Sequence, residues 1–433
     1  MNIRKIVKAV IPRGAFQKIE PLGHLAESMI WNVLYGFPGR GMKVIGVTGT
    51  NGKTTTSYLI HNMLVEAGYN AGIMTTVAYG VGRNIENQVH HYTNVPSREL
   101  MQRLRKMKAA GMDWLVLETT SQALVQYRTW GVPYSVAVMT NVTHEHLDYH
   151  KTFENYVAAK KRLFTLTQHN KSGLQVGIAN ADDPVGAEYA AETEKSVLYG
   201  IENGQVRAEN VLLKSDGIAY RAVAGDATYH ITSSLAGSFN VYNTLAAVCA
   251  GRTLGLSREN IEKGIASLRS VEGRMVTVDE GQPFGVIIDY AHTPDSFEKL
   301  FKDLRPIIKG KMIVMFGSAG RRDESKRAVQ GELAGRYADE VIITEEDNRD
   351  IDGVEIMQQI AAGVEKAGKK RDESLFLVGD RREAIAFALS RATSPDDTVL
   401  LLGKGHEKTI ERADGEHPWD ELGVTKDALR EIA

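Results

Sequence analysis

The chain has 433 residues, of which 43% are apolar and 24% are charged, and this length predicts about three domains. The 52 basic and 54 acidic residues give a formal net charge of −2, which excludes a protein that coats nucleic acid through a generally basic surface. The apolar content excludes a mainly disordered chain, and the single cysteine, Cys249, excludes a disulfide framework and a cysteine-based zinc site. Cys249 is therefore expected to be a small buried hydrophobe.

The first predicted element is an N-terminal helix with an apolar cluster at Met29–Phe37. This helix is expected to cap the next domain, and the alternative is a docking surface for a membrane or a partner. The basic residues Arg4, Lys5 and Lys8 precede Pro12, which interrupts the apolar stretch, so no signal peptide is expected. Because no apolar run reaches the roughly 20 residues that span a bilayer, we expect a cytoplasmic protein.

Short apolar runs alternate with helical stretches from Met42 onward, a pattern typical of β–α–β units around a parallel sheet. Residues 200–232 instead show polar alternation and several glycines, which predicts a small antiparallel insertion. A second α/β pattern begins near Arg274. The predicted strands are Val44–Val47, Trp114–Leu117, Ser135–Met139, Val286–Ile288, Met312–Phe316, Val341–Ile343 and Val399–Leu402. Ligands of open α/β sheets bind at the carboxyl ends of the strands, so polar residues that follow these runs are site candidates.

A strand, a glycine-containing loop and the start of a helix follow one another over Val44–Thr56. Backbone N–H groups of such a loop point at an anion and the helix dipole adds to the attraction, so the loop is predicted to bind nucleotide phosphates. Lys53 would reach the outer phosphates, and the Thr54 hydroxyl would bind Mg²⁺. The general P-loop spacing is missed by one position, because Val47 stands five residues before Gly52. The predicted phosphate-binding residues are Gly49, Thr50, Asn51, Gly52, Lys53, Thr54 and Thr55.

Further candidates lie at or after the next strands. Glu118 ends the run Trp114–Leu117, and a carboxylate beside nucleotide phosphates is a preferred Mg²⁺ ligand. His146 follows the strand Ser135–Met139 within a His-Glu-His segment; paired with His144 it would also suit zinc, but no third soft ligand is evident in the sequence. Asn240 and Asn243 stand at helical i, i+3 spacing, which suits either the reading of an adenine edge or the capping and polar face of a helix.

The Gly49–Thr55 loop resembles the ATP loop of the Mur ligase family, which includes the folylpolyglutamate synthases. Other segments resemble family motifs in the same order over roughly residues 42–410. These segments are Glu118–Arg128, His146–His150, Ala158–Lys160, Gly237–Ala247, Gly273–Met275, Asp289–Asp295, Phe316–Asp323 and Gly403–Glu407. The resemblance implies an α/β fold, with a P-loop-type central ATPase domain around a mainly parallel sheet and a Rossmann-like C-terminal domain. The domains are expected at residues 1–42 (a reduced substrate domain), 43–272 (ATP binding) and 273–433 (amino-acid binding).

Catalytic roles are implied for Lys53, Glu118, His146 and Lys160. In the family Glu118 and His146 would hold Mg²⁺ with Thr54, and Lys160 would carry a carbamate that turns a cation into an anionic metal ligand. Carbamate formation needs a neutral amine, so Lys160 must be partly desolvated. The alternative for Lys160 is an ordinary surface lysine on a helix.

The resemblance also implies contacts with both substrates of the first chemical step. For ATP it implies Asn240 and Asn243 at the adenine, Arg274 at a phosphate and Asp289 at the ribose; His292 is either a further ATP contact or a packing residue at the domain joint. The acceptor-binding residues implied by the family's T-T-P-S and E-V-S-S-H segments are Thr93, Ser97, Thr120, Ser121 and Arg128. The chain departs from these segments at Asn94-Val95, Thr120 and Gln122.

Glu346-Asp347-Asn348-Arg349 stands where the family member that adds the third residue of the peptidoglycan stem carries D-N-P-R, its diaminopimelate signature. The acid and Arg349 are present, and the proline is not. A guanidinium pairs bidentately with a carboxylate, so Arg349 favours diaminopimelate over lysine; the alternative is a solvated loop. Arg327, Gly403 and Glu407 complete the implied site, with Glu407 at the ammonium of the amino acid.

We therefore expect an ATP-dependent, ADP-forming ligase that joins meso-diaminopimelate to the D-glutamate carboxylate of a muramoyl dipeptide through an acyl phosphate. Mg²⁺ and the Lys160 carbamate are the expected cofactors. The expected partners are the muramoyl peptide and the diamino acid, without nucleic acid or a required membrane, for a monomeric chain. The segment before the ATP loop is much shorter than in the family, so a lipid-linked or shorter muropeptide is an alternative acceptor. A folylpolyglutamate-type or cyanophycin-type ligase is a competing function, and so is a non-catalytic ATP-binding subunit.

Overall fold

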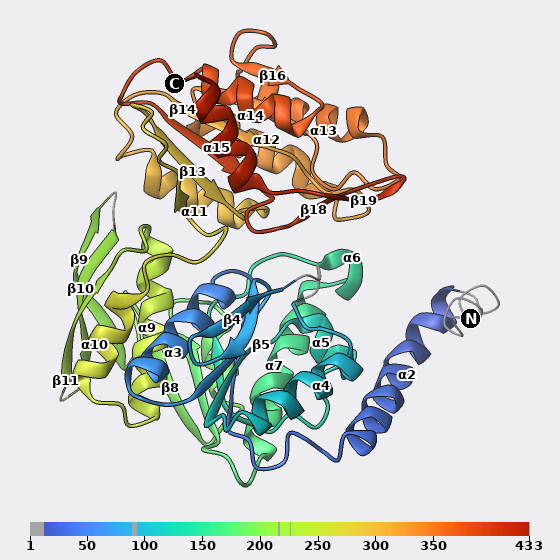
Figure 1. Ribbon diagram of the computed structural model, residues 1–433, viewed down its shortest axis with the longest axis vertical. Helices are drawn as coiled ribbons and strands as arrows, with labels where there is room; N and C mark the ends of the chain where they lie inside the picture. Colours follow the sequence, from blue (N-terminus) through green and yellow to red (C-terminus); the bar gives the residue numbers. More distant parts are fainter. Residues whose placement is uncertain (1–12, 89–92, 215–216, 226, 433) are drawn as a thin grey trace.

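The computed structural model describes residues 13–88, 93–214, 217–225 and 227–432. Figure 1 shows two lobes, each built on its own sheet, with the helix α2 along one edge of the lower lobe. The helices of the lower lobe are α2 Arg13–Leu34, α3 Lys53–Glu66, α4 Ser97–Ala109, α5 Ser121–Val125, α6 Leu147–His150, α7 Phe153–His169, α8 Gly186–Ala190, α9 Ser238–Thr253 and α10 Arg258–Ser267. Those of the upper lobe are α11 Pro294–Leu304, α12 Ser325–Tyr337, α13 Gly353–Lys366, α14 Arg381–Ser390 and α15 Glu421–Ile432.

The lower lobe is built on one sheet with the strand order β11-β10-β9-β8-β7-β6-β1-β5-β2-β3-β4. Its centre is parallel, and antiparallel strands occupy both edges. The strands are β1 Val44–Thr48, β2 Ala71–Met74, β3 Ala78–Val81, β4 Asn84–Asn87, β5 Trp114–Glu118, β6 Tyr134–Met139, β7 Val176–Asn180, β8 Lys195–Gly200, β9 Val206–Lys214, β10 Gly217–Ala224 and β11 Ala227–Ser233. The insertion predicted at 200–232 is thus confirmed as the antiparallel strands β9–β11.

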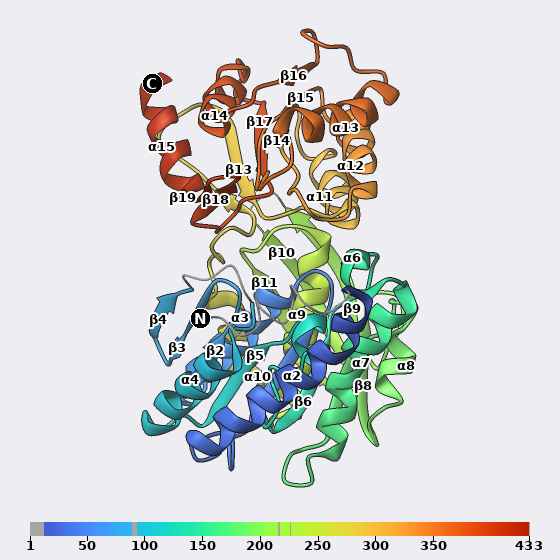
Figure 2. The ribbon, with the colours of Figure 1, turned by 90° about the vertical axis from the view of Figure 1, so that its right-hand side faces the viewer.

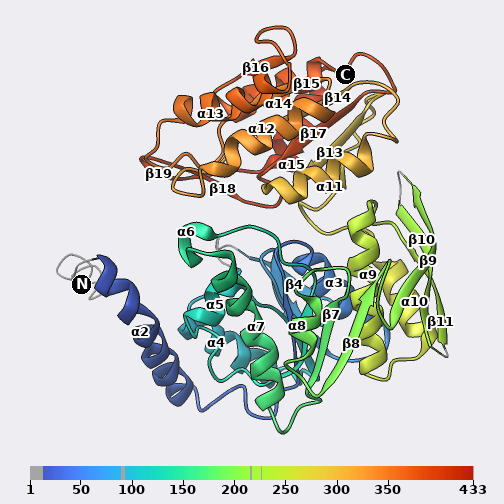
Figure 3. The same ribbon diagram turned by 180° about the vertical axis from the view of Figure 1, so that it is seen from behind.

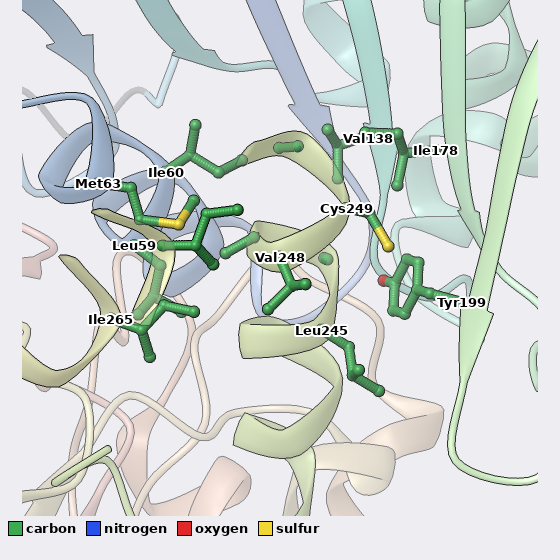
Figure 4. Close-up of a cluster of buried hydrophobic side chains, with 14 of the residues drawn as sticks. Leu59, Ile60, Met63, Val138, Ile178, Tyr199, Leu245, Val248, Cys249 and Ile265 are labelled. Atoms are coloured by element: carbon green, nitrogen blue, oxygen red, sulfur yellow. The ribbon is translucent and has the colours of Figure 1, made fainter. Parts of the chain in front are cut away.

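Both faces of the central strands are covered, which is why the predicted strands read as unbroken apolar runs. Along β1, Ile45 and Val47 pack toward α3, α9 and α10, whereas Val44 packs toward α4 and α7 on the other face. Figure 4 shows Cys249 of α9 beside Tyr199, Val138 and Ile178. The Cys249 side chain is fully buried, and burial raises the pKa of its thiol. The expectation of a buried hydrophobe at this position is confirmed.

The upper lobe is built on a second sheet with the order β12-β13-β17-β14-β15-β16, in which every strand except β12 is parallel to its neighbours. Its strands, with the separate hairpin β18–β19, are β12 Val276–Thr277, β13 Gly285–Asp289, β14 Met312–Phe316, β15 Glu340–Ile343, β16 Leu375–Leu377, β17 Thr398–Leu402, β18 Thr409–Arg412 and β19 Gly415–Pro418. Helices α11, α12 and α13 cover one face, and α14 and α15 cover the other, as the turned views in Figures 2 and 3 show. All seven strands predicted from apolar runs are present, and the expected α/β fold is confirmed.

Helix α2 packs on the lower lobe through its C-terminal half. The Ser28 hydroxyl lies 2.6 Å from that of Ser97 and donates to the Tyr127 carbonyl at 2.8 Å, while Asn32 Nδ2 donates to the Trp130 carbonyl at 3.0 Å. The helix predicted before position 42 therefore exists and rests on the next domain. No helix within the described residues combines the length and the apolar character that a membrane crossing requires.

Candidate active site

A cleft of about 1230 Å³ lies between the lobes. Its walls come from the loops after β1, β5, β6 and β7 in the lower lobe and from the loops after β13, β15 and β17 in the upper lobe. The carboxyl ends of the strands of both sheets thus border one space, the position at which ligands of open α/β sheets bind. Residues at the start of α9 and the hairpin β18–β19 complete the wall.

The loop after β1 forms a cradle at the N-terminus of α3. Gly49 and Gly52 both have positive φ, 151° and 81°, and Gly52 is the residue that precedes the helix. No side chain of the described residues caps this N-terminus, so its N–H groups and the positive end of the dipole are directed into the cleft. Lys53 Nζ donates to the Thr50 carbonyl at 2.7 Å, across the loop. This arrangement suits a polyphosphate.

Glu118 places a buried carboxylate beside the cradle, at the end of β5 next to β1. Its Oε2 accepts hydrogen bonds from the Thr54 hydroxyl and from the Thr76 backbone N–H, each at 3.0 Å. Asn94 Nδ2 donates to the Glu118 carbonyl at 2.7 Å and holds the strand end in place. The predicted metal ligands Thr54 and Glu118 are therefore adjacent.

Lys160 reaches the same loop from the opposite side. Its side chain, on α7, is 2% exposed, and Nζ donates to the Gly49 carbonyl at 2.6 Å and lies 4.5 Å from the centre of the Tyr156 ring. Burial, and then the charge of Lys53, hold the pKa of Lys160 well below its ordinary value. This environment disfavours the cationic form of Lys160, whereas neighbouring Lys161 is paired with Glu188 at the surface.

Glu145 joins two histidines across the cleft. Its Oε2 lies 3.6 Å from His146 Nε2 in the lower lobe, and its Oε1 lies 3.1 Å from His292 Nε2 in the upper lobe. Burial alone would raise the pKa of Glu145, but His146, His292 and Lys53 together lower it well below its ordinary value. Burial lowers the pKa of His146, which has the left-handed backbone φ of 57°. This lowered pKa favours the neutral imidazole over the cation, and the neutral form is the one that can bind a metal.

All the predicted acceptor residues except Ser97 line the cleft on the side of β5. Thr93 Oγ1 lies 2.8 Å from Thr76 Oγ1, and Ser121 Oγ lies 2.9 Å from His150 Nε2. Asn94 connects this wall, because its Oδ1 accepts from the backbone and hydroxyl of Thr120 and its carbonyl accepts from Arg128 at 3.0 Å. Asn94, which departs from the family segment, thus connects Thr120 and Arg128 of this wall through hydrogen bonds.

The predicted nucleotide residues lie on both lobes. Asn243 Nδ2 donates to Asn240 Oδ1 at 2.9 Å, and Asn243 Oδ1 also approaches Gly52, where an added Cβ would lie 2.2 Å away. Arg274 extends from the segment between the lobes, with Nη2 at 3.5 Å from the Thr54 hydroxyl and its guanidinium 4.5 Å from the Tyr290 ring centre. Both carboxylate oxygens of Asp289 accept backbone N–H bonds, from Met275 and Ala291.

The far end of the cleft is strongly charged. Arg349 Nε donates to Glu411 Oε2 at 2.7 Å, so a cation and an anion stand side by side there. Lys404 is fully buried and bonds Asp347 Oδ1 at 2.9 Å and Glu407 Oε2 at 2.5 Å. Glu346 Oε2 is buried and has no hydrogen-bond partner among the described residues. A ligand ammonium would supply that missing donor.

Six of the predicted site residues do not line the cleft wall: Gly49, Ser97, Lys160, Arg327, Asn348 and Gly403. Gly49 and Lys160 lie directly behind it, joined by their hydrogen bond. Gly403 has a φ of 104° and backs onto Glu346. Arg327 is 1% exposed and donates to Gln359 and to the Ala319 carbonyl, while Ser97 bonds Ser28 of α2. Asn348 lies against Gly353.

The donor set fits a hydrated magnesium ion better than zinc. The described residues contain no group of three His, Cys, Asp or Glu side chains placed to hold a metal. Mg²⁺ keeps several waters and needs one or two protein oxygens beside the nucleotide phosphates, which Thr54 and Glu118 offer. His144 is exposed and stacks on Phe153 at 4.4 Å between ring centroids, so it does not join His146 in a metal site.

Several residues of the site are not predicted by local sequence. Glu145 belongs to the His-Glu-His segment, and its place between two candidate histidines is the signal that could have pointed to it. Asn51 Nδ2 donates to Asp295 Oδ2 at 2.9 Å between the lobes, and Tyr242 donates to Asp182 at 3.1 Å beside the nucleotide end. No local pattern in the sequence predicts these contacts, since they depend on how distant segments meet.

Comparison with known proteins identifies the relatives of this fold and site. The Mur ligase middle domain matches residues 47–251, and the Mur ligase glutamate ligase domain matches residues 273–405. A UDP-N-acetylmuramyl-tripeptide synthetase of Roseiflexus sp. (strain RS-1) is 40% identical over 95% of this chain and 83% of its own length. The chain belongs to the Mur ligase family. It is an ATP-dependent, ADP-forming amide ligase of peptidoglycan synthesis.

Further members of the Mur ligase family extend the likeness. A UDP-N-acetylmuramoyl-L-alanyl-D-glutamate–2,6-diaminopimelate ligase of Geobacter metallireducens is 37% identical over 98% of this chain and 85% of its own. A solved structure with the same enzyme name has a TM-score of 0.61 and 28% identity, over 90% of this chain and 79% of that one. Mycobacterium tuberculosis folylpolyglutamate synthase with ADP has a TM-score of 0.73, 15% identity and 94% coverage of both chains, and therefore shares the fold.

Proposed function

We propose that this Mur ligase joins meso-diaminopimelate to the D-glutamate carboxylate of a muramoyl dipeptide. Relatives with two enzyme names support this substrate pair, one a tripeptide synthetase and the other a diaminopimelate ligase. The observation that carries the choice of amino acid is the Arg349–Glu411 pair at the far end of the cleft. Diaminopimelate ends in a second ammonium and carboxylate, which such a pair complements, whereas lysine ends in an ammonium alone.

The proposed reaction begins with attack of the acceptor carboxylate on the γ-phosphate of ATP. The acyl phosphate formed is then attacked by the amine, and phosphate leaves. Lys53 and the N-terminus of α3 would stabilise charge on the transferring phosphoryl group. Arg274 would add a second cation from between the lobes. Glu407 and Glu346 would hold the α-ammonium of the incoming amino acid, which Glu346 Oε2 is free to accept.

Thr54, Glu118 and His146 would hold Mg²⁺, which supplies charge neutralisation at the phosphates. We propose that Lys160 is carbamylated, because its burial disfavours a cation and lowers the pKa of its amine, and carbamate formation needs the neutral amine. Lys160 Nζ lies at the Gly49 carbonyl, so a carboxylate attached there would stand at the base of the phosphate loop. The loop, Glu118 and Lys160 together would position the acceptor carboxylate in line with the terminal phosphate.

The test is phosphate release from ATP with UDP-linked muramoyl dipeptide and, in turn, meso-diaminopimelate, lysine, ornithine or glutamate. We expect turnover with diaminopimelate and at most about 1% of that rate with lysine. Turnover with lysine at an equal rate would contradict the choice of amino acid. Turnover with a pteroylglutamate acceptor, or none with any acceptor, would contradict the muramoyl assignment.

Two variants separate the amino-acid site from the rest of the reaction. Arg349→Ala is expected to raise KM for diaminopimelate about 10-fold to 100-fold, with little change in the KM for ATP. Arg336→Ala is the matched control, because that arginine pairs with Glu332 on the surface of α12. Equal effects of both variants, or a change confined to the KM for ATP, would contradict the proposed position of the far carboxylate.

A further inference from the structure

The tip of the phosphate loop is held by the segment that follows β6. Asn51 N–H donates to Asn141 Oδ1 at 3.0 Å, and Asn141 Nδ2 donates back to the Asn51 carbonyl at 3.0 Å. The Thr140 hydroxyl donates to the same carbonyl at 2.6 Å, and Thr50 N–H donates to the Asn141 carbonyl at 2.7 Å. One side-chain amide therefore pairs with both backbone hydrogen-bonding groups of a single loop residue, as a neighbouring strand would.

The side chain of Thr50 is fixed by the same segment. Its hydroxyl accepts from Thr143 N–H at 2.9 Å and lies 3.2 Å from the Thr143 carbonyl and 3.1 Å from the Tyr156 hydroxyl. The preceding residue, Gly49, lies so close to this segment that an added Cβ would overlap Thr140 Oγ1. We call Thr140, Asn141 and Thr143 the loop clamp, because all three hold the backbone or side chains at the loop tip.

The loop clamp decides which backbone N–H groups remain for a nucleotide. Those of Thr50 and Asn51 are already donated to Asn141. Thr56 N–H donates to the Gly52 carbonyl at 2.9 Å, and the N–H groups that precede it at the start of α3 have no partner within the helix. The donors directed at an anion are therefore those between Asn51 and Thr56. Their direction depends on how the chain enters the helix from the clamped residues.

The loop clamp also belongs to the segment that carries the predicted metal ligand. Glu145 and His146 follow Asn141 in this segment, before α6 begins. Val142 N–H donates to Asp183 Oδ2 at 2.7 Å, which anchors the segment to the loop after β7. The hydrogen bonds of the clamp therefore fix the start of α3 relative to His146, across the space that the phosphates of a nucleotide would occupy.

We propose that Asn141 is a positioning residue for ATP in the ligase reaction. Its amide holds the loop tip so that the N–H groups at the start of α3, rather than the N–H of Asn51, meet the phosphates. Asn51 then serves a different purpose, since its side chain donates to Asp295 of the upper lobe at 2.9 Å. The proposal depends on ATP being the nucleotide of this family, and it does not depend on which amino acid is joined.

The test is nucleotide binding by the full chain with Asn141→Ala. Loss of both amide hydrogen bonds should raise the Kd for ATP with Mg²⁺ about 10-fold to 100-fold, measured by calorimetry. The Kd for adenosine, which has no phosphate, should stay within about 2-fold, measured by competition. Amide hydrogen exchange without nucleotide gives a separate readout, because Asn51 N–H should exchange at least about 10-fold faster in the variant. An unchanged Kd for ATP, unchanged exchange, or equal weakening of ATP and adenosine would overturn the proposal.

Two further variants separate positioning from folding. Thr140→Val keeps the shape of the side chain and removes the other side-chain donor to the Asn51 carbonyl, so the Kd for ATP should rise about 3-fold to 10-fold. Asn170→Ala is the matched control, because Asn170 Nδ2 donates to the Tyr134 carbonyl at 2.9 Å, at the opposite end of β6. That control should leave the Kd for ATP unchanged. Equal losses of ATP affinity in the two asparagine variants, or none in Thr140→Val, would overturn the proposal.

Discussion

The side chain of Lys160 lies in surroundings that disfavour its cationic form. It is buried against the phosphate loop, with Lys53 close enough to lower its pKa further and Gly49 as its hydrogen-bond acceptor. The adjacent Lys161 has the opposite environment, because Glu188 and Glu192 hold it as a surface cation and raise its pKa. Two neighbouring lysines of one helix therefore have different chemistry, and the difference is testable.

Replacement of Lys160 by Ala is expected to lower ATP-dependent phosphate release about 100-fold, the scale seen when the support of a metal site is lost. Lys161→Ala, the matched control, should stay close to the activity of the unchanged chain. Phosphate release in buffer depleted of CO₂ should fall and return on addition of bicarbonate. Activity that is indifferent to bicarbonate would argue against a carbamate, and equal loss in both variants would point to a role in folding.

The phosphate loop depends on a glycine that has no room for a side chain. Gly52 has a φ of 81°, and an added Cβ would lie 2.2 Å from Asn243 Oδ1. Gly52→Ala is therefore expected to raise the Kd for ATP at least about 10-fold, measured by calorimetry. Gly68→Ala is the control, since Gly68 has a φ of 86° with open space around it. Similar losses in ATP affinity for both variants would mean that strain alone, rather than the clash with Asn243, explains the effect.

Local sequence is sufficient for the residues that act close to the ends of predicted strands. Lys53, Thr54 and Glu118 follow such strands directly, and the structure brings all three to the cleft. Local sequence is insufficient for a residue whose contact partner comes from a distant part of the chain. Ser97 is expected at the acceptor, yet its hydroxyl bonds Ser28 of α2, and Glu145 gains its importance only when the second lobe supplies His292.

At the scale of elements, buried polar contacts fix the positions of helices relative to neighbouring strands and helices. His61 of α3 is 6% exposed and its Nε2 lies 3.1 Å from the Ala71 carbonyl at the start of β2. Arg381 of α14 and Glu421 of α15 are both fully buried and form a bidentate pair at 2.9 and 2.6 Å. Each tie joins one helix to a neighbouring element and gives a separate stability prediction.

The buried position of His61 predicts that the folded state loses stability in acid. Burial lowers its pKa from 6.5 to about 4, so the unfolded chain binds a proton that the folded chain resists. The stabilising contribution is full above pH 6.5 and falls by up to about 3 kcal/mol as the pH drops through the window from 6.5 to about 4. Urea unfolding across this window should show a shallower pH slope for His61→Gln. An unchanged slope would contradict the neutral imidazole.

Arg381→Met should cost about 3–5 kcal/mol of unfolding free energy, because it leaves the Glu421 carboxylate buried without its cation. Arg381→Met combined with Glu421→Leu should cost less than the single change. Arg430→Met removes the surface pair with Glu280 and should cost much less than Arg381→Met. Urea unfolding measures all three, and a double variant less stable than the single one would show that the pair is not the source of the effect.

The central strands are easier to predict than the hairpin β18–β19, which contacts Arg349 at the far end of the cleft. Central strands such as β14 are buried on both faces and appear in the sequence as unbroken apolar runs. Hairpin β18–β19 has one fully buried apolar residue, Ile410, among polar ones. Its sequence therefore lacks the alternation of apolar and polar residues from which a strand is predicted. Its Glu411 nevertheless sets the environment of Arg349. The specificity of the site is therefore less visible in local sequence than its phosphate loop.

At the scale of the molecule, each lobe has its own core, and the lobes meet through polar contacts and through Phe239 of α9, which packs against the upper core. Asn51 bonds Asp295 at 2.9 Å, and Glu145 pairs with His292 at 3.1 Å. Polar interfaces of this kind permit relative motion of domains, which lets substrates enter before the cleft closes around them. Both contacts lie beside the phosphate loop, and Ser238 N–H of α9 adds a third by donating to Asp303 of α11.

Asp295→Ala combined with Glu145→Gln should loosen the two lobes. We expect a larger radius of gyration in small-angle X-ray scattering without ligand, and a KM for the amino acid that rises about 10-fold. Glu298→Ala is the control on the same helix, since Glu298 pairs with the exposed Lys302. Unchanged scattering and unchanged KM would show that different contacts set the separation of the lobes.

The segment between the lobes also forms part of the wall of the cleft. Arg274 belongs to this linker, and its guanidinium is placed between Thr54 below and Tyr290 above. Rotation of the upper lobe about the linker would therefore move the Arg274 side chain. Because Arg274 is also a predicted contact of an ATP phosphate, we expect nucleotide binding to change the angle between the lobes, and a fluorophore attached near the linker should report both events as one signal.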